Sequence, residues 1–204
     1  MLRLDHLAVA AGTLNDGVAA VGAALGVALA PGGKHPLMGT HNRLLSLGDL
    51  YLEVIAVDPD APAPGHPRWF DLDRFTGPPR LSNWIAACDD LDAALRDLPP
   101  GLGTPLALAR GDLRWSMAVP DSGCLPFDNA FPALIEWQGA AHPAPRLPDT
   151  GVRLLRLEIA HPEATALRAA LAPHFSDARV VVTDGPARAM RAEFTTPHGT
   201  RVLE

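Results

Sequence analysis

Apolar and polar positions follow the same order three times along this chain. Each repeat opens with a short apolar run typical of a strand, continues with an apolar stripe at helical spacing, and closes with three further strand candidates. The opening strands are expected at Leu2–Val9, Leu81–Ala87 and Val152–Ala160. The pattern therefore predicts an α+β fold built from repeated βαβββ modules.

Capping residues set the expected helix boundaries. Thr13 is a candidate N-cap for the first helix, and Gly26 is placed to end it. In the second unit Asp89 or Asp90 can cap the helix that Pro99 stops. The remaining strand candidates are Val27–Ala30, Arg43–Leu47, Leu50–Val57, Pro105–Arg110, Leu113–Val119, Ala133–Gln138, Val180–Thr183, Ala189–Thr195 and Arg201–Glu204.

Two proline-rich stretches, Asp58–Pro79 and Gly139–Asp149, separate the three units. Proline fixes φ and lacks a backbone donor, so both stretches are expected to be connections. The expected organisation is a domain of paired modules at 1–138, with modules at 1–57 and 81–138 and a linker at 58–80, and an additional βαβββ-like unit at 151–204 packed on the same domain.

Composition narrows the class of protein. Of the 204 residues 48% are apolar, enough for a real core, and the net charge of −6 disfavours nucleic acid and anionic membranes as partners. No apolar run is long enough to span a bilayer, and the first residues lack a signal-peptide pattern, so a cytoplasmic protein is expected. Cys88 and Cys124 lack metal-type spacing and are expected to be free thiols.

Four stretches resemble a known superfamily in their order and spacing. They are Leu4–Val9, Met38–Leu44, Tyr51–Val54 and Phe131–Trp137. Together they resemble the vicinal oxygen chelate proteins, which include glyoxalase I, extradiol dioxygenases and bleomycin-resistance proteins, and within them the glyoxalase-like domain proteins. The resemblance implies a curved mixed sheet around a pocket for a small-molecule substrate, with metal ligands on the first and last strands of each module. A homodimer is a further expectation.

By that pattern His6 and Glu53 would be metal ligands from the first module, and Asn83 and Glu136 hold the matching positions in the second. The imidazole and the two carboxylates suit Zn²⁺, Ni²⁺, Co²⁺, Mn²⁺ or Fe²⁺. Such a metal polarises a carbonyl, while Glu136 beside it would move the proton as the catalytic base. Asn83 departs from the pattern, because an amide binds these ions weakly; a weaker site, a harder ion or no metal all remain open.

Each candidate also has a structural interpretation. His6 can be a hydrogen-bonded histidine of the core, and Asn83 can serve a hydrogen-bonding structural role. Glu136 can form a salt bridge with Arg114 or Arg146.

Substrate contacts are expected from His41, Asn42, Asn83 and Trp69. Trp69 and Phe70 lie in the first proline-rich stretch, where loop aromatics either cover the outer face of the sheet or form a wall or lid of the pocket. Five histidines beside Pro or Gly or near helix ends are expected at the surface: His66, His142, His161, His174 and His198.

Two functions follow from the resemblance. One is a metal-dependent lyase or isomerase that acts beside a carbonyl, as glyoxalase I does, and the other is a metal-free small-molecule binding or sequestering protein of the bleomycin-resistance type. No dinucleotide-binding glycine motif, phosphate loop or Gly-x-Ser-x-Gly elbow is present, so the sequence does not indicate those activities.

Overall fold

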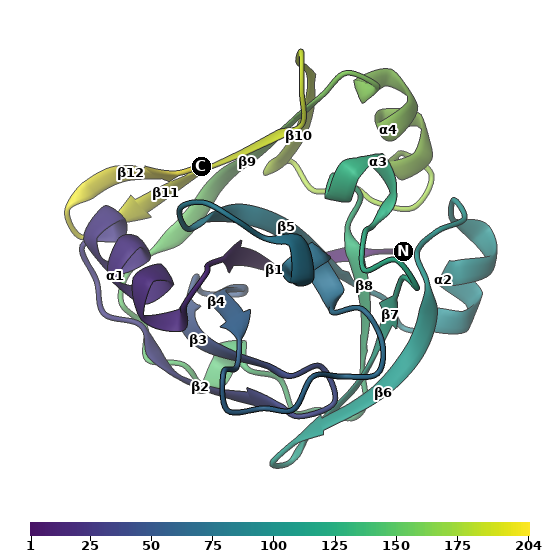
Figure 1. Cartoon of the computed structure of the whole chain (residues 1–204). Coiled ribbons are helices and arrows are strands. Elements are labelled where there is room, and N and C mark those ends of the chain that lie inside the picture. The colour runs from purple at the N-terminus through teal and green to yellow at the C-terminus, as the bar shows by residue number, and fades with distance from the viewer.

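The computed structural model describes all 204 residues and contains two β-sheets (Figure 1). The larger sheet has eight strands in the order β2-β3-β4-β1-β5-β8-β7-β6 and curls into a half-barrel. The smaller sheet has four strands in the order β10-β9-β11-β12. The predicted α+β class and its curved sheet of βαβββ modules are therefore confirmed.

The first two units build the half-barrel. The first unit contains β1 (Arg3–Ala10), α1 (Leu14–Leu25), β2 (Ala30–His35), β3 (Thr40–Ser46) and β4 (Tyr51–Val57). The second contains β5 (Arg80–Ala87), α2 (Leu91–Asp97), β6 (Thr104–Arg110), β7 (Leu113–Val119), the short α3 (Pro126–Asn129) and β8 (Ala133–Trp137). Short 3-10 segments lie in the two proline-rich stretches: η1 (Trp69–Arg74), which is interrupted by left-handed backbone at Phe70 and Asp71, and η2 (Ala144–Arg146).

Local sequence explains where the helices begin and end. The Thr13 side chain accepts a hydrogen bond from the Asp16 N–H at 3.1 Å, and Gly26 ends α1 in the left-handed region with φ 72°. Of the two candidate caps of α2, Asp90 is the one used: its side chain accepts from the Ala93 N–H at 2.8 Å.

The two modules meet at the centre of the half-barrel, where β1 pairs in parallel with β4 and antiparallel with β5. Ala8 on β1 lies opposite Glu53 on β4 and Asn83 on β5. Residues directly opposite one another point to the same face of a sheet. Glu53 and Asn83 therefore share the concave face, although they belong to different modules.

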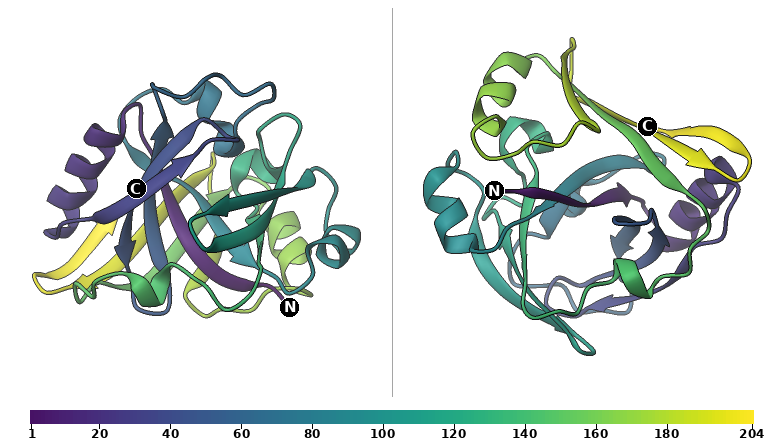
Figure 2. Two further views of the ribbon diagram at one scale, coloured as in Figure 1. Left: turned by 90° about the horizontal axis from the view of Figure 1, so that it is seen from below. Right: turned by 180° about the vertical axis from the view of Figure 1, so that it is seen from behind.

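The third unit contains β9 (Arg153–His161), α4 (Ala164–Leu171), β10 (Val180–Asp184), β11 (Ala189–Thr196) and β12 (Gly199–Leu203). Its elements follow the predicted order, but its pairing differs from that of the first two units: β9 pairs with β10 and β11, whereas β1 and β5 pair with the last strand of their own module. Figure 2 shows the small sheet lying beside the half-barrel.

One apolar core joins the two sheets. Trp84 on β5 is fully buried, donates its indole N–H to the Ala130 carbonyl at 2.9 Å, and meets the ring of Phe175 edge-on at 5.1 Å. Phe194 of β11 is also fully buried in this core. Both cysteines are free thiols, as expected. None of the helices combines the length and apolarity needed to traverse a bilayer.

Candidate functional site

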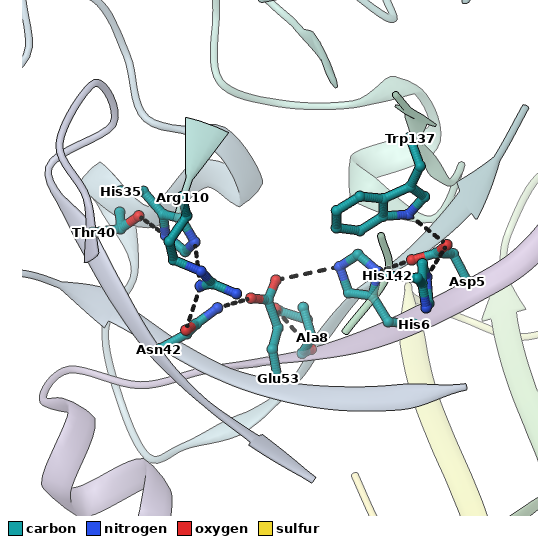
Figure 3. Close-up of polar contacts among 11 residues, drawn as sticks. Asp5, His6, Ala8, His35, Thr40, Asn42, Glu53, Arg110, Trp137 and His142 are labelled. Carbon is teal, nitrogen blue, oxygen red and sulfur yellow. Dashed lines mark hydrogen bonds and ion pairs between the residues drawn. The ribbon is translucent and has the colours of Figure 1, made fainter. Parts of the chain in front are cut away.

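A row of hydrogen-bonded, buried polar side chains lies along the floor of the half-barrel (Figure 3). Glu53 on β4 and His6 on β1 are both about 5% exposed, and Glu53 Oε1 lies 3.5 Å from His6 Nε2. The other oxygen, Oε2, accepts a hydrogen bond from Asn42 Nδ2 at 2.8 Å. On the far side of the imidazole, His6 Nδ1 lies 2.6 Å from Asp5 Oδ1. The His6 ring is thus held between two carboxylates.

The row of polar side chains continues beyond Asp5 toward the connection that follows β8. Asp5 Oδ2 accepts hydrogen bonds from Trp137 Nε1 at 2.9 Å and from His142 Nε2 at 3.1 Å. Sequential residues of a regular strand point to opposite faces, but the register of β1 against β5 shifts between Leu4 and His6. This β-bulge at Asp5 re-aims its side chain, so that Asp5 and His6 can bond to each other.

The surroundings of His6, Glu53 and Asp5 determine the charges of these three side chains at neutral pH. Burial alone would lower the pKa of His6, but its hydrogen bonds with Asp5 and Glu53 and their charges outweigh burial and raise the pKa to about 9. Burial alone would raise the pKa of Glu53; the hydrogen bond and charge of His6 and the bond from Asn42 lower it instead. The hydrogen bonds of His142 and His6 hold the pKa of Asp5 well below its usual range, against burial. An imidazolium therefore sits between two ionised carboxylates.

A second group of polar side chains continues from Asn42. Arg110 Nη1 lies 3.2 Å from Asn42 Oδ1 and 3.3 Å from His35 Nε2, and His35 Nδ1 lies 3.0 Å from Thr40 Oγ1. Burial lowers the pKa of His35 to about 4, so this imidazole is neutral. Its Nε2 then accepts from Arg110, and its Nδ1 donates to Thr40.

Aromatic side chains form the wall of the pocket above these groups. Tyr51 stacks on the His6 ring at 4.3 Å, and Trp69 meets His35 edge-on at 5.2 Å. Phe70, Trp115, Met117 and Trp137 complete the wall. Trp69 and Phe70 therefore line the pocket and do not cover the outer face of the sheet. The cavity they enclose is about 30 Å³, room for about one water molecule, so a larger ligand requires movement of this wall.

The expected site residues are not all in one place. The structure brings His6, Glu53, Asn42 and Trp69 together, but Glu136 is on the opposite face of the sheet, because its neighbours Ile135 and Trp137 point inward. Glu136 Oε2 accepts a hydrogen bond from the Leu91 N–H at 2.8 Å, at the start of α2. Glu136 thus supports a helix N-terminus, and it pairs with neither Arg114 nor Arg146.

Two other expected contacts lie outside the His6 pocket. His41 Nδ1 is 4.0 Å from Asp58 Oδ1, and the side chain lines a separate pocket beside the start of α1. Asn83 is on the concave face but lines a neighbouring pocket beyond Phe70. The expectation that five histidines lie at the surface is wrong for His161, which is 2% exposed, and His142 is half-buried against Asp5.

The donor set does not fit the metal that the resemblance implies. Glu136 and Asn83 are elsewhere, and nowhere in the chain do three His, Cys, Asp or Glu side chains form a group that could hold a metal ion. A metal at the His6 imidazole would also have to displace the proton that the ring shares with Asp5 and Glu53. The residues that sequence reasoning missed are Asp5, Arg110 and His142; Asp5 alone carried a signal, its position beside His6.

Comparison with solved structures identifies similar folds. A hypothetical protein from Staphylococcus aureus is 13% identical, with a TM-score of 0.65 over 92% of this chain and 88% of that one. Methylmalonyl-CoA epimerase from Streptomyces coelicolor is 18% identical, with a TM-score of 0.45 over 68% of this chain and 95% of that one. The corresponding enzyme from Mycobacterium tuberculosis is 18% identical, with a TM-score of 0.43 over 68% of this chain and 88% of that one.

No curated protein matches the chain in a sequence comparison. The family model described as glyoxalase-like domain matches residues 4–175, which span most of the chain and include His6, Asn42 and Glu53. The half-barrel of two βαβββ modules and its enclosed concave pocket agree with that match. This chain therefore belongs to the glyoxalase-like domain family.

Proposed function

We propose that this protein is a small-molecule enzyme that moves a proton on a carbon next to a carbonyl, as a lyase or isomerase does, with Glu53 as the base. The observation that carries the proposal is the Glu53–His6 pair. The pair is buried at the floor of an aromatic pocket, with one member ionised and the other protonated at neutral pH. Neighbouring groups with pKa values pushed apart are the usual basis of acid and base roles.

The two partners divide the chemistry. The ionised Glu53 carboxylate accepts the proton from the carbon, and the hydrogen bond from Asn42 holds it in position. His6 carries a proton on Nε2 that faces Glu53 at 3.5 Å. Once Glu53 has taken the proton from carbon and lost its charge, that N–H can donate to the carbonyl oxygen, where negative charge develops. Asp5 on Nδ1 keeps the ring oriented and charged. This proposal places the base on β4, where the resemblance expected Glu136 on β8.

The proposal assigns no step to a metal ion. In its place the His6 imidazolium supplies the positive charge that would stabilise the enolate oxygen. Arg110, which bonds to Asn42 at 3.2 Å, adds a second cation near the pocket. A bound divalent ion would have to displace the His6 proton and share the pocket with the Arg110 cation, whose charge repels it.

Hydrogen exchange tests the proposal without knowledge of the physiological reaction. The protein is incubated in D₂O with 2-oxo carboxylates, hydroxy ketones and thioesters, and loss of the C–H signal beside the carbonyl is followed by ¹H NMR. Exchange is expected with the unaltered protein in at least one class and is expected to fall at least 100-fold in Glu53→Gln. Glu136→Gln is the matched control, because it alters a carboxylate on the opposite face.

The alternative function, a binding protein without catalysis, is favoured by one observation. Three tryptophans, Trp69, Trp115 and Trp137, line a cavity of only about 30 Å³. Their rings form a wall suited to an apolar ligand. Ligand binding detected by quenching of tryptophan fluorescence, with no exchange in any class and no effect of Glu53→Gln, would support this alternative and refute the enzyme proposal.

A further inference from the structure

A second pocket of about 270 Å³ adjoins the first, and Phe70 lines both. Its walls come from the start of β5, from η1, from the segment around α3 and from the turn between β10 and β11. Arg188, on that turn, is the one lining residue that the third unit supplies. The pocket is therefore closed by a side chain from outside the paired modules.

Asn83 points into this second pocket with no partner for its amide. The residue is 1% exposed, and neither Nδ2 nor Oδ1 forms a hydrogen bond. A buried amide without partners costs free energy, and native structures contain few of them. The orientation of Asn83 therefore indicates a ligand that supplies the missing hydrogen bonds.

Two guanidinium groups lie beside that amide without a carboxylate partner. Arg188 donates from Nη2 to the Ser82 carbonyl, and its Nε has no partner. Arg80 stacks over the Phe75 ring at 4.2 Å and donates to the Thr76 carbonyl at 2.7 Å.

The electrostatics of the second pocket favour an anion. Burial, and then the nearby charge of Arg80, lower the pKa of Arg188, so the two cations repel each other across the pocket. Arg74, the third arginine of the lining, is already paired with Asp71 at 2.8 Å. The charge of Asp128, the remaining acid of the lining, partly offsets this repulsion at Arg188, but its side chain is 88% exposed and points largely into solvent. An anion bound between Arg80 and Arg188 would remove their repulsion.

We infer that Arg188, Arg80 and Asn83 form a subsite for an oxyanion group, a carboxylate or a phosphate, of the small molecule that reacts at Glu53. Guanidinium groups bind both anions through paired N–H donors, and the Asn83 amide adds a further donor. Glu53 and Asn83 lie on either side of Ala8 on neighbouring strands, so their backbones are about 10 Å apart. A small acid can therefore span both pockets once the Phe70 ring moves aside.

The inference rests on the proposed function for its reactive end, but its test measures binding alone. Malonate and inorganic phosphate are titrated separately at constant ionic strength, and binding is followed by the ¹⁵N-resolved NMR signal of the Asn83 amide. Saturable binding in the millimolar range is expected for at least one anion, and the anion that binds more tightly identifies the group. Arg188→Gln should weaken that binding at least 10-fold.

Arg191→Gln is the matched control, because Arg191 is also on the third unit but pairs with Glu193 away from this pocket. It should bind as the unaltered protein does. Arg80→Gln is a second pocket variant, which keeps the test valid if Arg188→Gln does not fold. It should also weaken anion binding at least 10-fold. Equal binding by the unaltered protein and both pocket variants, or no shift of the Asn83 signal at saturation, would overturn the inference. Loss of exchange at Glu53 with anion binding intact would count against the proposed function alone.

Discussion

The charge on His6 makes a quantitative prediction about how stability depends on pH. The pKa of His6 is about 9 in the folded protein and 6.5 in an unfolded chain. Below pH 6.5 both states bind the proton, and the stabilisation is fully present. Between pH 6.5 and 9 only the folded state keeps the proton, so stability falls as pH rises through this window.

The difference between the two pKa values corresponds to about 3 kcal/mol in the free energy of unfolding. That loss is a large part of the total stability of an ordinary domain, which is about 5–15 kcal/mol. Asp5 and Glu53 stay ionised over the whole window, because their pKa values are lowered. Cys88, whose pKa burial raises to about 11, adds a decline of the same sign only near and above pH 9.

Urea unfolding followed by tryptophan fluorescence, at half-unit steps from pH 6 to pH 9, measures the decline. His6→Gln removes the titrating group and should show a decline about 3 kcal/mol smaller, whereas His198→Gln, at an exposed position, should behave as the unaltered protein. Asp5→Asn removes one of the two carboxylates and should also reduce the decline. Equal declines in the unaltered protein and in His6→Gln would refute the assignment of an imidazolium between two carboxylates.

Two further predictions concern Glu136 and metal ions. Glu136→Gln replaces the charged acceptor of the Leu91 N–H with a neutral one and should lower the free energy of unfolding by about 1 kcal/mol, measured by urea titration; a loss above about 3 kcal/mol would contradict this small role. Zn²⁺ and Ni²⁺ should bind the His6 pocket no more tightly in the unaltered protein than in Glu53→Ala, as measured by calorimetry at pH 7, because no three donor side chains converge there. Stoichiometric binding that the substitution abolishes would contradict the donor-set argument.

The backbone was largely predictable from sequence because its signals are local. Thr13 and Gly26 mark both ends of α1, and alternation of apolar residues marks Leu113–Val119. Strand β2 was misplaced: Val27–Ala30 was expected, and the strand is Ala30–His35, because its Pro-Gly-Gly sequence has little strand propensity and forms through pairing with β3.

The site was only partly predictable because its signals are not local. The roles of His6 and Glu53 in one site followed from the resemblance, and the structure brings the two side chains together. In the structure, side chains alternate along β8 so that Glu136 faces away from them. The position of Glu136 depends on strand register, which a shift of one residue reverses, and no local pattern fixed that register. Arg110 and Arg188 reach their pockets across more than 60 residues of sequence, from β6 to Asn42 and from the third unit to Ser82.

The two modules that meet where β1 pairs with β5 contribute different kinds of side chain to the His6 pocket. Asp5, His6, Asn42 and Glu53 all come from the first half, whereas the second half lines the same hollow with Trp115, Met117, Ile135 and Trp137. The acid and base groups thus come from the first half, whereas the second half supplies much of the wall, the Arg110 cation and the Trp137 hydrogen bond to Asp5. Substitutions at Trp115, Met117 or Ile135 can therefore change which molecule fits and leave Asp5, His6 and Glu53 with their hydrogen bonds intact.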